Sequence, residues 1–136
     1  MNITDRWRSW APYFLSLLRF MVGLLFVQMA SAKLFAFPGA VIPGGGTVPL
    51  ASLGGVGSVL EFVGGWLLLV GLFTRPVAFL LSGQMAVAYF GFHAPNGFWP
   101  ILNQGGDAIF YCFTFLYLSA AGGGPVSLDA KLRGVN

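Results

Sequence analysis

The first long apolar stretch of the sequence covers residues 12–37 and reads PYFLSLLRFMVGLLFVQMASAKLFAF. It exceeds the ~20 residues with which an α-helix crosses a hydrocarbon core of about 30 Å. Its only charged residues are Arg19 and Lys33. The stretch therefore predicts a helix that spans a membrane, and it indicates that lipid surrounds much of the chain.

Three further apolar stretches follow, at residues 54–73, 76–93 and 106–122, and each is close to the length of a spanning helix. Inside a bilayer every backbone N–H and C=O group must find a partner within the protein, and a helix supplies these partners itself. The connection at residues 37–53 is rich in glycine and proline and cannot hold a regular helix. The sequence thus predicts an all-α integral membrane four-helix bundle with a single domain over residues 1–136.

Composition agrees with a chain that lies mostly in lipid. Of the 136 residues, 57% are hydrophobic and 8% are charged, whereas a soluble domain carries about 25% charged residues. The seven Lys and Arg residues occur singly or in pairs, so no basic stripe is present for a nucleic acid. With one cysteine, Cys112, and one histidine, His93, we expect no metal site and no intrinsic cofactor on this chain.

Basic residues flank the predicted spans on one side of the membrane. They are Arg6 and Arg8 before the first span, Arg75 between the second and third, and Lys131 and Arg133 after the fourth. The two other connections, residues 37–53 and 94–106, carry no charge. Because short loops rich in Lys and Arg stay in the cytoplasm, this pattern predicts an N-in/C-in orientation.

A signal peptide is the competing interpretation of the N-terminal region. The run from Met21 to Met29 is followed by the small residues Ala30-Ser31-Ala32, as at a cleavage site. However, a long charged region precedes this run, and Arg19 and Gln28 interrupt its apolar character. These features favour a helix that is retained.

Four titratable residues fall near the outer ends of the predicted spans, one from each span. They are Lys33, Glu61, His93 and Asp107. An ionisable side chain costs about 2.5–3.5 kcal/mol at the centre of a bilayer, so each is a candidate functional residue. Their convergence in one layer predicts a polar site near the outer face of the bundle.

A purely structural interpretation of these residues stays open. Lys33 would then only pair with Glu61, while Arg19, on the same helix face as Lys33, would reach the cytoplasmic headgroups along its aliphatic stem. Gln28 and Gln84 would make interhelical hydrogen bonds. Three more residues would be solvated or would cap helix ends, namely His93, Asn103 and Asp107.

Four parts of the sequence carry a family resemblance. They are LLRFMVGLLFVQMASAKLF at residues 17–35, EFVGGWLLLVGLFTR at residues 61–75, and residues 93–99 and 103–111. In these parts the chain is similar to the DoxX family of small bacterial membrane proteins. The positions that look characteristic of the family are Arg19, Gly23, Phe26, Lys33, Glu61, Gly65, Gly71 and Arg75. Two positions depart from the pattern. Ala30 stands where the family often has Gly, and Asp107 stands where it more often has Glu.

The resemblance implies a four-helix bundle and a loose association with redox metabolism, since a related membrane subunit belongs to a thiosulfate:quinone oxidoreductase and other relatives are linked to oxidative or thiol stress. We therefore predict a membrane subunit that binds a quinone or a similar small redox molecule near the outer leaflet and supports an oxidoreductase. Such a ligand needs titratable groups beside an apolar cleft. The predicted catalytic residues are Glu61, His93 and Asp107, and the predicted ligand contacts are Arg19, Lys33, Trp99, Asn103 and Tyr111.

Two other functions fit the same sequence. The bundle could be a non-catalytic assembly subunit of a larger membrane complex, given its small size and many glycines. It could also be a small-molecule or proton conduit, because Arg19 and Lys33 share a helix face about 21 Å apart at 1.5 Å per residue. A partner protein subunit and a homo-oligomer are compatible with each of these functions.

Overall fold

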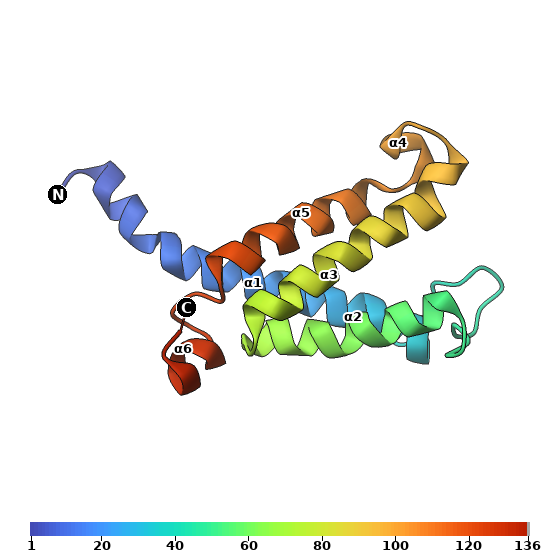
Figure 1. The fold of residues 1–136 in the computed structure, drawn as a ribbon, viewed down its shortest axis with the longest axis horizontal. Coiled ribbons are helices and arrows are strands. Elements are labelled where there is room, and N and C mark those ends of the chain that lie inside the picture. The colour runs from blue at the N-terminus through green and yellow to red at the C-terminus, as the bar shows by residue number, and fades with distance from the viewer. Residues whose placement is uncertain (136) are drawn as a thin grey trace.

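Helices make up all the regular structure of residues 1–135, the part of the chain that the computed structural model describes (Figure 1). In chain order the elements are α1 (Ile3–Phe35), α2 (Leu53–Val70), α3 (Thr74–Ala88), the π-helical turn η1 (Tyr89–His93), the 3-10 turn η2 (Ala94–Asn96), α4 (Pro100–Asn103), α5 (Gly106–Ala121) and α6 (Leu128–Arg133). The predicted all-α fold is therefore confirmed.

The long helices pack as two pairs that meet at a shared core. α1 lies along α2, α3 lies along α5, and α2 also contacts α3. Phe26 of α1 fills the centre, with its ring centroid 4.8 Å from that of Phe115 and 5.2 Å from that of Tyr111, both on α5. The core is completed by residues of α2, α3 and α5, including Leu68, Leu81 and Leu118.

The outer surface of the bundle is apolar. Among the described residues, three helices are long and apolar enough to cross a membrane, Ile3–Phe35, Leu53–Val70 and Thr74–Asn96, and Gly106–Ala121 is a shorter apolar helix. Large side chains such as Phe79, Phe90 and Phe110 are more than half exposed on these helices. Because a water-facing surface would not carry so many large apolar groups, this chain is a multi-pass membrane protein whose helices face lipid.

The helices follow the predicted spans with differences at their ends. α1 begins at Ile3, ahead of the predicted span 12–37, because the Asn2 side chain accepts a hydrogen bond from the Asp5 N–H and caps the helix. α2 ends at Val70, because Gly71 takes a left-handed conformation with φ 74°. The short helices α4 and α6 have no counterpart among the predicted spans.

Both described ends of the chain lie toward the same end of the bundle. In Figure 1 the start of α1, the α2–α3 turn and α6 lie toward the left, whereas the two long connections, residues 36–52 and 94–105, lie toward the right. We call the first the terminal end and the second the loop end. The predicted polar site belongs to the loop end.

Candidate functional site

A partly buried polar cluster joins three helices near the loop end. Lys33 Nζ lies 2.8 Å from Glu61 Oε2 and 3.2 Å from Glu61 Oε1. Gln84 Nε2 donates to Glu61 Oε1 at 3.2 Å and to the Gly57 carbonyl oxygen at 2.9 Å. The predicted pairing of Lys33 with Glu61 and the predicted interhelical bond of Gln84 are therefore confirmed. Gln28, for which the same kind of bond was expected, is exposed on α1.

Local sequence explains how the cluster is held. Glu61 is only 4% exposed because it lies in the interior of α2, on the side where glycines let neighbouring helices approach. Lys33 occupies the last turn of α1, where a positive charge is favoured by the helix dipole. The Lys33 carbonyl oxygen accepts from the Val48 N–H at 2.9 Å, which ties the connection between α1 and α2 to the same place.

The cluster keeps one donor and one acceptor without a partner within residues 1–135. An ammonium group has three N–H donors, and two of those on Lys33 are directed to Glu61. The Lys33 side chain is 29% exposed, so its remaining donor has access from outside. Gln84 Oε1 is buried and accepts no hydrogen bond. The cluster therefore has hydrogen-bonding capacity that the described residues do not use.

His93 and Asn103 form a separate polar group at the loop end. His93 Nδ1 lies 3.1 Å from the Asn103 carbonyl oxygen. The buried Asn103 side chain donates to the Gly97 carbonyl oxygen at 2.8 Å and accepts from the Gly105 N–H at 2.8 Å. Asn103 therefore organises the connection that leads into α5, as the structural interpretation predicted for a residue at a helix end.

The remaining loop-end residues are not joined to the cluster. Asp107 is exposed in the first turn of α5, Trp99 is 63% exposed, and Tyr111 packs against Phe26 and Phe115 in the core. Across the described chain, no hydrogen bond or ion pair links His93 or Asp107 to Lys33 or Glu61. The structure thus brings together two of the four titratable residues, and the catalytic roles of His93 and Asp107 stay predictions.

Arg19 is buried near the terminal end, far from the cluster. It is 2% exposed and donates to the carbonyl oxygens of Gly123 at 2.9 Å and Leu69 at 2.7 Å, and also to those of Leu68 and Val126. The interpretation in which Arg19 reaches the headgroups is therefore wrong. Its guanidinium instead donates to carbonyl groups in the last turn of α2, where helical N–H partners run out, and in the segment after α5.

Asp129 is a buried residue that the sequence did not reveal. Its carboxylate accepts from the N–H groups of Phe73 at 2.8 Å and Thr74 at 2.9 Å, so it caps the start of α3 from α6. The Thr74 hydroxyl does not cap this helix and is buried without a partner in residues 1–135. The only signal in the sequence was one acid in an otherwise basic tail, and nothing linked it to a helix 55 residues earlier.

Comparisons with known proteins found a family model and a relative that match this chain. The family model described as DoxX matches residues 14–94, which include α2, most of α1 and all of α3. A protein of Haemophilus influenzae, described as an uncharacterized protein, is 42% identical over 136 residues, an alignment that covers 96% of this chain and 97% of the relative. No solved structure matches.

Proposed function

The chain belongs to the DoxX family, and from its partly buried loop-end cluster we propose that it binds a quinone or a similar small redox molecule there. The observation that carries the proposal is the cluster's unused pair of groups. The third Lys33 N–H would donate to a quinone carbonyl oxygen, and Gln84 Oε1 would accept from a hydroxyl group once the ligand is reduced. The ion pair with Glu61 holds the Lys33 side chain in place.

Aromatic side chains beside the cluster support a flat ring as the ligand. Phe35, two residues after Lys33, packs edge-on against Phe62, the residue after Glu61, with ring centroids 5.5 Å apart. Trp66 continues the row, with its ring centroid 6.4 Å from that of Phe62. Phe35 and Trp66 are 60% and 48% exposed. A ring that enters from the lipid would therefore meet aromatic edges before it reaches Lys33.

Proton handling is the part of the reaction that this chain's residues would perform. Reduction of a quinone to a quinol takes up electrons and protons together, so the site needs a group that can hold a proton beside the ring oxygen. Glu61 and Lys33 form such a pair, and their direct contact would let a proton pass between them. Electrons would come from a redox-active partner subunit.

We place this site in the outer leaflet of a bacterial inner membrane, with four spans and both ends of the chain in the cytoplasm. Support comes from the basic residues, because Arg75, Lys131 and Arg133 all lie at the terminal end and short basic loops stay in the cytoplasm. α5 has 16 residues and a length of about 24 Å at 1.5 Å per residue. It would cross a membrane by local thinning of the bilayer, which costs fractions of a kcal/mol per Å.

Binding of a short-tailed quinone by the purified protein in lipid nanodiscs tests the proposal. We expect saturable quenching of tryptophan fluorescence, and a loss of affinity of about tenfold or more in Lys33→Gln, since a hydrogen bond from a charged group contributes about 1.5–3 kcal/mol. Lys131→Gln is the matched control because it removes the same charge from an exposed position of α6 at the opposite end. Absence of binding, or equal affinity in Lys33→Gln and the control, would contradict the proposal.

A role as an assembly subunit is the second candidate. Two surface hollows stand out in residues 1–135, and neither is lined by Lys33 or Glu61. The loop end also carries large exposed apolar residues, Phe98, Ile101 and Leu102, that a partner would cover. This role would be favoured if the chain co-purifies with another membrane protein in a fixed ratio and if neither the wild-type chain nor the two variants bind quinone. The conduit alternative gains no support from Arg19, whose donors are directed to backbone carbonyl groups.

A further inference from the structure

The first part of α1 extends beyond the helix bundle. Residues 1–14 are all exposed, and Figure 1 shows the start of α1 continuing past the ends of the other helices. α1 has 33 residues and is about 50 Å long, whereas the hydrocarbon core is about 30 Å thick. The part from Pro12 to Phe35 spans about 36 Å by itself. The segment before Pro12 therefore lies outside the hydrocarbon core.

Pro12 marks the boundary for a second reason. Proline has no backbone N–H, so the carbonyl group of Arg8, one turn earlier, loses its helical partner. An unpaired carbonyl group is costly in hydrocarbon but is satisfied by water at the headgroup level. The segment from Asn2 to Ala11 is thus a helix at the membrane–water interface.

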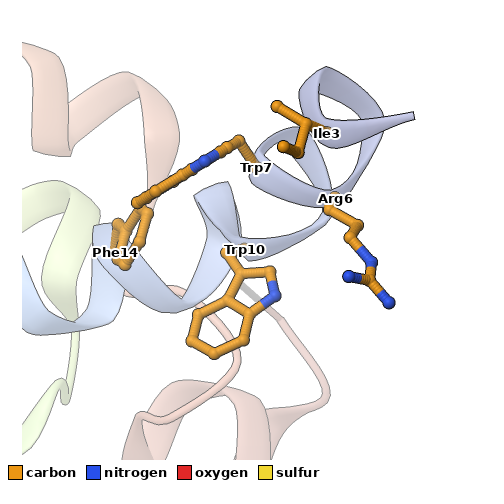
Figure 2. Close-up of a pocket in the computed structure, with 5 residues that line it drawn as sticks. All are labelled: Ile3, Arg6, Trp7, Trp10 and Phe14. Carbon is orange, nitrogen blue, oxygen red and sulfur yellow. The ribbon is translucent and has the colours of Figure 1, made fainter. Parts of the chain in front are cut away.

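One face of this segment is aromatic and carries a positive charge at its edge. Ile3, Trp7, Trp10 and Phe14 follow steps of four, three and four residues and share a face. Together with Arg6 they line a hollow of about 510 Å³. Figure 2 shows the Trp7 ring extending toward Phe14, with ring centroids 5.8 Å apart, and the Arg6 guanidinium extending away from the helix. Within residues 1–135 the Arg6 side chain makes no hydrogen bond or ion pair.

We propose that this hollow binds an anionic phospholipid of the leaflet at the terminal end, with the lipid phosphate at Arg6, the glycerol and ester groups against Trp7 and Trp10, and the start of the acyl chain at Phe14. Charge complementarity selects this occupant. The guanidinium matches a phosphate with paired N–H donors, and tryptophan rings favour the headgroup level. Arg8 lies about 200° further around the helix at 100° per residue, so it faces away from the hollow.

Tryptophan quenching by brominated lipids tests the site in the full-length chain. In a background of Trp66→Phe and Trp99→Phe, Trp7 and Trp10 are the remaining tryptophans, and excitation that tyrosine does not absorb reports on them alone. The protein is placed in vesicles of phosphatidylcholine and phosphatidylglycerol in equal parts, with bromine carried by one lipid or by the other. We expect stronger quenching by brominated phosphatidylglycerol, which means that the anionic lipid is enriched beside the two rings.

Two arginine variants separate a site from a general surface charge. Arg6→Gln should lower the enrichment about fivefold, the effect of one basic residue near an anionic surface. Arg8→Gln removes the same charge from the other face and should change the enrichment much less. Equal quenching by the two lipids in the wild-type chain, or equal losses in Arg6→Gln and Arg8→Gln, would overturn the proposal.

Discussion

Arg19 shows how a single residue can tie three parts of the chain together. Its guanidinium bonds carbonyl groups of α2 and of the segment between α5 and α6, while its backbone belongs to α1. A buried positive charge is costly unless it is compensated. Here the negative C-terminal end of α2 and the carbonyl oxygens provide that compensation. Arg19 therefore holds α1, α2 and the segment after α5 together at the terminal end of the bundle.

We expect Arg19→Lys to destabilise the protein by about 2–3 kcal/mol, the contribution of one or two hydrogen bonds to a charged group. Lysine keeps the charge but has three donors and no planar fork, so it cannot serve four carbonyl oxygens. Thermal unfolding in detergent, followed by circular dichroism, measures the effect. Arg8→Lys, at an exposed position of the same helix, should stay within about 0.5 kcal/mol of wild type. Equal melting of the two variants would show that the bonds of Arg19 contribute little.

At the scale of helices, the contact between α1 and α2 depends on glycine. A Cβ atom at Gly23 would lie 2.6 Å from the Leu69 backbone nitrogen, and one at Gly65 would lie 3.0 Å from the Val27 backbone nitrogen. Two backbones cannot approach this closely if either carries a side chain, which is why membrane helix contacts favour small residues. The same contact aligns Lys33 on α1 with Glu61 on α2.

Gly23→Ala is expected to destabilise the bundle by about 1–3 kcal/mol, the usual effect of an overpacked core. It should also weaken quinone binding, because separation of α1 from α2 lengthens the contact between Lys33 and Glu61. Gly83→Ala is the matched control, since a Cβ atom at Gly83 on α3 would meet nothing within 4 Å. Melting temperatures of the two variants decide the matter. A lower stability for Gly83→Ala than for Gly23→Ala would contradict the packing argument.

At the scale of the whole molecule, both described ends and the α2–α3 turn lie together, so the membrane orientation can be tested at two positions. A fluorescent protein fused to the C-terminus should fluoresce, since we place that end in the cytoplasm. Alkaline phosphatase inserted at Gly45, in the connection between α1 and α2, should be active because its disulfides form only outside the cytoplasm. A C-terminal fusion that does not fluoresce, together with inactive phosphatase at Gly45, would contradict the proposed orientation.

The sequence alone was sufficient for the fold class and for the pairing of Lys33 with Glu61. Long apolar stretches predict helices in lipid whatever surrounds them, because each helix pairs its own backbone groups. Lys33 and Glu61 could be matched because two opposite charges at the same depth in a membrane have few other partners. The aromatic start of α1, in contrast, lacks an apolar run, so its continuation as helix before Pro12 was not predicted.

Only the tertiary structure decided where the other polar residues are used. Arg19 and Asp129 bond backbone groups that are 49 to 107 residues away in the sequence. Backbone carbonyl and N–H groups occur all along the chain, so no sequence pattern marks the one that a distant side chain will bond. The separation of His93 and Asp107 from Lys33 depends on packing as well. Helix periodicity gives the face and the depth of a side chain, but the rotation of one helix pair against the other determines which faces meet.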